Sequence, residues 1–220
     1  MKDDESGKRT KNGQASRGSR AEARRATEES ILKAAERVFA EAGFGGATMQ
    51  LIADVAGLPK ANLHYYFETK ESLYRRVVER IFNIWLEAAD VFDEASGPAE
   101  GIGAYIDAKM EISRNHPNGS KVWASEVMHG APVIQDYLET TLRDWTEGRA
   151  VIIRRWIAEG KMAEVDPHHL LYMLWATTQH YADFSHQIET LNGGAPLSDA
   201  QWEEAKTCVK SIVLRGIGVT

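Results

Sequence analysis

The chain has 220 residues, 43% of them hydrophobic and 26% charged, and this balance excludes collagen-like, low-complexity and wholly disordered proteins. A single cysteine excludes an intramolecular disulfide framework and cysteine-rich metal sites. The net charge of −6 is unevenly spread, because residues 1–80 carry 15 basic and 12 acidic side chains whereas residues 81–220 carry 11 and 20, so an anionic partner is expected only at the N-terminal end.

The first segment, residues 1–22, is rich in Lys, Arg, Gly and Ser and nearly devoid of apolar side chains. This composition predicts a disordered basic arm, with an expression tag as the alternative. Because no secretory signal is evident and the longest apolar stretch, residues 170–176, is far below the ~20 residues of a membrane span, we expect a cytoplasmic protein with no membrane partner. The arginines that could reach phosphates or a minor groove, unless the arm only solubilises the protein, are Arg17, Arg20, Arg24 and Arg25.

The rest of the chain shows helical periodicity and no alternating β-branched run bounded by hairpin turns. Breaks fall at glycine- and proline-containing segments such as 97–98, 116–119, 130–132 and 192–196. This pattern predicts an all-α protein of about nine helices. The expected helices are residues 23–42, 49–56, 60–66, 70–94, 99–115, 119–129, 132–160, 167–192 and 199–216.

Two of these helices, residues 49–56 and 60–66, are short and joined by Gly57-Leu58-Pro59. Two short helices around a glycine-containing turn, after a longer packing helix, are typical of a helix-turn-helix DNA-binding unit. The hydroxyl of Thr48 is placed to cap the first of them. The apolar side chains expected to lock the two helices together are Ile52, Val55, Leu63 and Phe67.

A dense pattern of about 45 residues surrounds this motif. It comprises Ile31-Leu32-x-Ala34-Ala35, Phe39, Gly43-Phe44, Thr48, Ile52-Ala53, Ala56-Gly57, Leu63-x-Tyr65-Tyr66-Phe67, Lys70 and Leu73. In these residues the chain resembles the TetR family of bacterial transcriptional regulators. The resemblance implies a three-helix DNA-binding head over residues 23–69 and a ligand-binding and dimerisation body over residues 70–220. It also implies a homodimer that places each third helix in a major groove of double-stranded operator DNA.

The resemblance further implies which side chains meet DNA. Hydroxyl and ammonium groups suit phosphates, and the matching positions are Thr48, Tyr65 and Lys70. Lysine can donate to guanine and asparagine can bind adenine through two hydrogen bonds, and the candidates for base edges are Lys60, Asn62 and His64. The family commonly has a small hydroxyl residue and a tyrosine at the last two positions, so the operator sequence is left open. Alternatively, the lysines are solvated and the tyrosine is part of the core.

All six tryptophans lie in the acidic body, where large aromatic side chains either fill a core or line an apolar pocket. Residues 171–187 form an apolar segment interrupted by Gln, His and Asp, with Trp175 and Gln179 on one helical face. An amide beside an indole can recognise the edge of a lactam or imide by donor and acceptor together while the indole packs on the flat ring. This segment therefore indicates a ligand site.

A second pattern covers much of the body. It comprises Ile84-Trp85-Leu86, Lys109-x-Glu111-x-Ser113-Arg114, Pro117, Gly130-Ala131-Pro132, Gly160-Lys161, Asp166-Pro167-x-His169-Leu170 and Trp175-Ala176-x-Thr178-Gln179-His180-Tyr181-Ala182-Asp183-Phe184. In these stretches the chain is similar to the pyrimidine-utilisation (Rut) subfamily of TetR regulators, and this similarity implies uracil or thymine as the effector. By position, Trp85, Trp175 and Gln179 would hold the ring; alternatively, Gln179 forms an interhelical or dimer-interface hydrogen bond.

The last two expected helices resemble the pair that forms the family's dimeric four-helix bundle. The apolar side chains that would supply this surface, unless they belong to the core of one subunit, are Leu171, Leu174, Trp202, Val209, Ile212, Val213 and Ile217.

Catalytic and metal-binding patterns are missing from the sequence. His168 and His169 are adjacent, so on a helix their rings diverge by about 100°, and no Gly-x-Ser-x-Gly, Walker or dinucleotide motif occurs. We therefore expect no enzyme, no cofactor and no metal site, but a ligand-responsive DNA-binding regulator that acts as a repressor. The alternatives are a regulator of an apolar or drug-like effector, an enzyme acting on a nitrogen heterocycle, and a helical adaptor.

Overall fold

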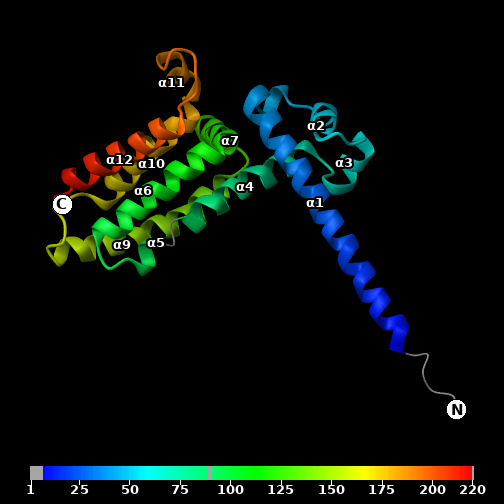
Figure 1. Ribbon diagram of the computed structural model, residues 1–220, viewed down its shortest axis with the longest axis horizontal. Coiled ribbons are helices and arrows are strands. Elements are labelled where there is room, and N and C mark those ends of the chain that lie inside the picture. The colour runs from blue at the N-terminus through cyan, green and yellow to red at the C-terminus, as the bar shows by residue number, and fades with distance from the viewer. Residues whose placement is uncertain (1–6, 89–90, 220) are drawn as a thin grey trace. The chain divides into compact units, whose positions relative to one another are not determined.

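The computed structural model describes residues 7–88 and 91–219, and every regular element in these ranges is helical. The expected all-α class is confirmed (Figure 1). The elements are α1 (Gly7–Gly46), α2 (Met49–Ala56), α3 (Lys60–Tyr66), α4 (Lys70–Ala88), α5 (Val91–Glu94), α6 (Pro98–Asn115), α7 (Pro117–Met128), α8 (Gln135–Tyr137), the π-helical turn η1 (Leu138–Leu142), α9 (Arg143–Ala158), α10 (Pro167–Asp183), α11 (Ser185–Leu191) and α12 (Asp199–Gly216).

The chain divides into two compact units, residues 1–77 and 78–220. The boundary falls inside α4, seven residues beyond the start of this helix at Lys70. The family resemblance implies a body that begins at residue 70. Within the described residues, no helix is long and apolar enough to cross a bilayer.

In the first unit, α1 packs against α2, and α2 packs against α3. The hydroxyl of Thr48 accepts a hydrogen bond from the backbone N–H of Leu51 at 3.1 Å, which confirms the expected cap of α2. Gly57 ends α2 in the left-handed conformation (φ 67°, ψ 30°), and the N–H of Leu58 bonds back to the carbonyl of Ala53. This turn sets the angle at which α3 leaves α2.

The core of the helix-turn-helix differs from the expectation at one position. Ile52 and Leu63 are fully buried and Phe67 is nearly so, but Val55 is 42% exposed. The expectation for Val55 was wrong because Ala53, which follows Ile52 directly, takes the inward place on this short helix.

The start of α1 also differs from the expectation. Residues 1–22 were predicted to be a disordered arm, yet the helix begins at Gly7, while residues 1–6 lie outside the described part of the chain. Helix extension adds one hydrogen bond for each residue fixed, and the Ala-, Glu- and Arg-rich residues 21–29 favour it. Near the other end, Gly43 leaves the helical region with φ 67° and ψ 172°.

The second unit is built around α6, which packs against α5, α7, α10 and α12. Its core joins α5, α6, α9, α10 and α12 through buried apolar side chains, among them Phe92, Ile102, Ile106, Met110, Ile153, Trp156, Leu171, Leu174, Val213 and Ile217. Four of the seven side chains expected at a dimer surface are therefore core residues of one subunit, whereas Ile212 is 67% exposed. The apolar side chains on the inner faces of α10 and α12 pack against α6 and so belong to the core of one subunit.

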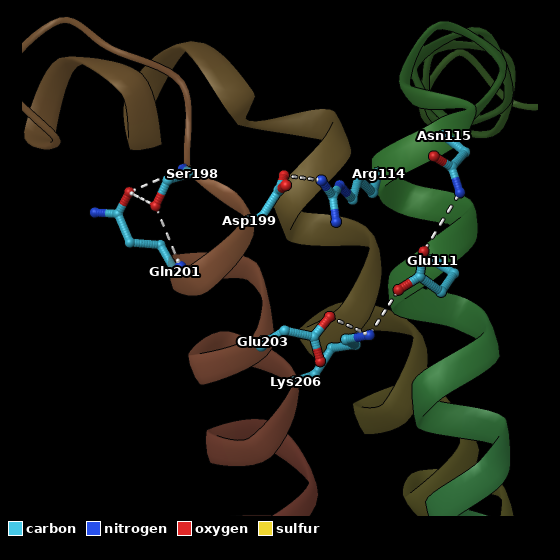
Figure 2. Close-up of polar contacts among 8 residues, drawn as sticks. All are labelled: Glu111, Arg114, Asn115, Ser198, Asp199, Gln201, Glu203 and Lys206. Carbon is cyan, nitrogen blue, oxygen red and sulfur yellow. Dashed lines mark hydrogen bonds and ion pairs between the residues drawn. The ribbon is translucent and has the colours of Figure 1, made fainter.

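A ladder of polar contacts ties α6 to α12 (Figure 2). Lys206 lies between Glu111 on α6, at 2.6 Å, and Glu203 on its own helix, at 2.8 Å. Arg114 binds Asp199, and α12 itself begins with a capping box in which Ser198 and Gln201 bond reciprocally. These contacts fix α12 along the side of α6.

Two expected long helices are interrupted in the structure. Residues 132–160 were predicted as one helix but form α8, the π-turn η1 and α9. Residues 167–192 divide at Phe184 (φ −113°, ψ 29°) into α10 and α11. Neither break contains glycine or proline, so the local sequence carries no strong indication of it.

Candidate functional site

The surface of α3 presents the side chains that were predicted to meet DNA. Lys60, Asn62, His64 and Tyr65 are all exposed, and Tyr65 is exposed to 73%. Leu63, on the opposite side of the helix, is fully buried against the first unit's core. The short helix therefore displays its polar face to solvent, as a DNA-reading helix requires.

Lys70 has a structural role that the sequence did not reveal. Its Nζ donates to the carbonyls of Phe44, at 2.7 Å, and Ala47, at 3.0 Å, and lies 4.3 Å from the centroid of the Phe44 ring. The ammonium thus ties the start of α4 to the end of α1 and to the residue that follows it. A phosphate contact by Lys70, as predicted, would have to use its remaining N–H.

In the second unit, a cavity of about 240 Å³ lies among α4, α6, α7, η1, α9 and α10. The three side chains predicted to hold a ligand, Trp85, Trp175 and Gln179, all line it. The complete lining is Phe82, Trp85, Leu86, Tyr105, Lys109, Trp123, Val127, Leu138, Leu142, Trp145, Trp175 and Gln179. It combines a mostly apolar wall with a few polar groups, as small-molecule sites do.

Aromatic rings form most of this wall. The ring centroids of Trp85 and Trp123 are 5.1 Å apart, nearly perpendicular, and Phe82 stacks on Trp123 at 5.2 Å. The centroids of Trp145 and Trp175, which also line the cavity, are 6.2 Å apart. Such contacts hold flat surfaces at defined angles, so the site suits a planar ring.

Tyr105 supplies one of the polar groups. The indole N–H of Trp175 donates to its hydroxyl oxygen at 2.9 Å, which leaves the phenolic hydrogen available to donate. Burial raises the pKa of Tyr105, so this hydroxyl stays protonated. Trp175 is held by the same bond in one orientation.

Lys109 is the least expected member of the site. Its side chain is only 2% exposed, and Nζ lies 4.1 Å from the centroid of the Trp85 ring. Burial lowers the pKa of Lys109 to about 7, and the carboxylate of Asp183 opposes this shift only in part. Burial also raises the pKa of Asp183, although its Oδ1 accepts a 2.6 Å hydrogen bond from Ser120.

This lysine gives the protein a specific pH dependence. An unfolded lysine titrates at about 10.4, whereas folding lowers the pKa of Lys109 to about 7. Between these values the unfolded chain binds the extra proton, so stability rises with pH. From pH 7 to pH 9, urea unfolding should show the wild type gaining up to about 1.4 kcal/mol per pH unit relative to Lys109→Met. A difference independent of pH would contradict this assignment.

Sequence patterns pointed to part of this cavity only. Of the six tryptophans, Trp123 and Trp145 had not been assigned to a site. Tyr105 and Lys109 had not been recognised as ligand-site residues. A usable signal existed, because Tyr105 and Lys109 are four residues apart and share the face of α6 that also carries Ile102 and Ile106. A lysine on an otherwise apolar helical face indicates a polar function inside the fold.

In the described ranges, no group of three or more His, Cys, Asp or Glu side chains could hold a metal ion. His168 instead contacts Glu147 at 2.9 Å. His180 stacks on Phe184, with ring centroids 4.8 Å apart.

Two family models match the chain on either side of the boundary inside α4. The model of bacterial regulatory proteins of the tetR family matches residues 31–77, and the model of the C-terminal region of YcdC-like proteins matches residues 78–220. The HTH-type transcriptional regulator RutR of Escherichia coli K12 is 38% identical over 200 residues, which are 91% of this chain and 94% of RutR. The chain belongs to the TetR family of transcriptional regulators.

Further transcriptional regulators are similar to the chain in sequence or in fold. The transcriptional repressor NicS of Pseudomonas putida is 29% identical over 113 residues, about half of each chain. The ketosteroid transcriptional regulator KstR2 of Mycobacterium tuberculosis has a TM-score of 0.69 at 22% identity, over 86% of this chain and 94% of KstR2. A TetR-like regulator from Rhodococcus sp. RHA1 has a TM-score of 0.64 at 20% identity, over 86% and 94% of the two chains.

Proposed function

We propose that this TetR regulator is a repressor whose effector is a pyrimidinedione such as uracil or thymine, bound in the cavity of the second unit. The observation that carries the proposal is the joint presence of Trp85, Trp175 and Gln179 in the lining of one cavity. The 38% identity to RutR supports the same effector class. Release from operator DNA would follow from preferential binding of the effector to a DNA-incompetent state.

The polar groups of the cavity suit the edge of such a ring. A pyrimidinedione alternates carbonyl acceptors with N–H donors, and the amide of Gln179 offers one acceptor and two donors. Tyr105 and Lys109 add donors for further carbonyls. The four indoles supply flat apolar surfaces for the ring faces.

On the DNA side, α3 is proposed to enter the major groove. Lys60, Asn62 and His64 would face base edges, and Thr48 and Tyr65 would contact phosphates. The exposure of all five side chains supports these roles.

A homodimer is proposed to form through α10 and α12, since the two recognition helices must be held at a fixed spacing. An apolar groove on these helices supports the proposal, and Met173 and Ile212 there are 41% and 67% exposed. Burial of such side chains between subunits is favourable at about 25 cal/mol for each Å².

The coupling between ligand and DNA is proposed to use α4. This helix runs from Lys70, bonded to the α1–α2 junction, to Trp85 on the cavity wall. A ligand that moves Trp85 would therefore act on the same helix that anchors the DNA-binding unit. By linkage, operator DNA would weaken effector binding by the same factor.

The test is effector-induced release in a gel-shift titration with uracil. Trp85→Ala should retain operator binding but need about 5–150-fold more uracil, because stacking of a base on an aromatic ring contributes about 1–3 kcal/mol. The control is Met128→Ala, because Met128 is 75% exposed on α7 and lies outside the cavity lining, and this variant should respond like the wild type. An unchanged response of Trp85→Ala would remove Trp85 from the site.

A second candidate effector is an apolar or drug-like compound, which the mostly aromatic wall also favours. It predicts that thermal-shift screening finds no preference for pyrimidines. Release by such compounds and none by uracil or thymine would support this alternative.

A further inference from the structure

The charge in the cavity lining is positive only. Among its described lining side chains, Lys109 is the only charged one and none is acidic. In the part of the chain that the structure describes, Nζ of Lys109 forms no ion pair within 4 Å, and it lies over the ring of Trp85. A cation removed from water is costly unless an anion compensates it. The carboxylate of Asp183, which is not part of the lining, opposes the effect of burial on Lys109 only in part, so the cavity favours negative charge.

Hydrogen-bond donors outnumber acceptors among the groups of the lining. Tyr105 and Lys109 can donate, and Nε1 of Trp145 is buried without a hydrogen-bond partner among the described residues. Among the lining side chains, only the amide of Gln179 is a strong acceptor that no described interaction occupies. A complementary ligand therefore presents several acceptors and few donors.

We propose that Lys109 makes this cavity select ring imides by their acidity, and that the imide binds as its anion opposite the ammonium group. The inference rests on the proposed pyrimidinedione effector and adds a determinant of specificity to it. On binding, the N–H bond of the imide breaks. The proton moves to Nζ when Lys109 enters as the neutral amine, or to solvent when it enters charged, and the negative charge spreads over the flanking carbonyl oxygens.

The proposal is tested with uracil, 5-fluorouracil and 6-azauracil, which have nearly the same shape and increasing acidity. Their affinities for the full-length protein are measured by isothermal titration calorimetry at one pH below the pKa of all three. If only the anion binds, affinity follows the fraction of ligand ionised, so it should rise roughly tenfold for each unit by which the ligand pKa falls.

Lys109→Met removes the charge and should bind the three rings with nearly equal affinity. Lys121→Met is the matched control, because Lys121 also acts on Asp183 but does not line the cavity, and it should keep the wild-type order. A spectroscopic readout is independent of either variant's stability: ¹⁹F NMR of 5-fluorouracil bound to the wild type should show the chemical shift of the free anion.

The outcomes separate the two hypotheses. Equal affinities of the wild type for the three rings, or a neutral-form ¹⁹F shift, would overturn the role of Lys109 and leave the pyrimidine effector intact. If no ring binds, the proposed effector class is wrong and the inference about Lys109 is rejected with it.

Discussion

Raising the salt concentration from 50 to 200 mM is expected to weaken operator binding by this TetR regulator about 10³–10⁵-fold. A dimer that neutralises ~6–10 phosphates releases their counterions, and binding therefore falls steeply with added salt. The body carries an excess of acidic residues, so the contacts must come from the N-terminal unit. Gel-shift or fluorescence-anisotropy titrations over this range measure the slope directly.

The same experiment distinguishes a phosphate contact of Lys70 from a purely structural role. If its third N–H reaches a phosphate, Lys70→Met should lower the salt slope by roughly 0.9 for each subunit. If Lys70 acts only through the carbonyls of Phe44 and Ala47, the slope should stay unchanged while stability falls. Uracil binding, which involves no phosphate, provides the control and should vary little with salt. An operator affinity independent of salt would argue against DNA binding by this surface.

Replacing Trp156 by alanine is expected to lower the free energy of unfolding by about 3–5 kcal/mol. Trp156 is 1% exposed and stacks on Phe92 with ring centroids 6.0 Å apart. It lies so close to α6 that a Cβ added at Gly101 would come within 2.7 Å of the indole. With the rings this tightly packed, little can collapse into the space that the indole leaves.

Urea unfolding followed by far-UV circular dichroism measures this loss, and Trp202→Ala provides the matched control. Trp202 is only partly buried, beside Tyr181 at 5.6 Å and under Arg114, so its removal should cost clearly less. Equal losses for the two variants would show that Trp156 is not the principal anchor of this core.

Helices whose ends are marked by capping or turn-forming residues could be predicted from the sequence. The bounds of α2 and α3 match the expectation at every residue, because Thr48 caps one end and Gly57 and Pro59 mark the turn. The helix start expected at residue 167 is confirmed, and its cap Asp166 accepts from the N–H of His169 at 2.9 Å. Such signals are local, so no knowledge of the tertiary structure is needed.

The cavity was only partly predictable, because its members come from six separate elements. Trp175 and Gln179 share one helix and could be paired by helical spacing alone. Tyr105 joins them only through a hydrogen bond to a residue 70 positions away. Lys109 on α6 contacts the ring of Trp85 on α4. Contacts of this kind depend on packing, which periodicity within one helix does not encode.

The number of residues in the π-turn η1 determines which side chains of this segment face the cavity. Leu138 and Leu142, at its two ends, both line the cavity. A π-turn accommodates one residue more than an α-helix would in the same span, and each residue of an α-helix turns the chain by about 100°. Removal of a single residue from 138–142 would therefore rotate Leu138 and everything N-terminal to it in α8 away from the cavity. Related regulators could change the shape of this pocket by such insertions and deletions while every aromatic side chain stays the same.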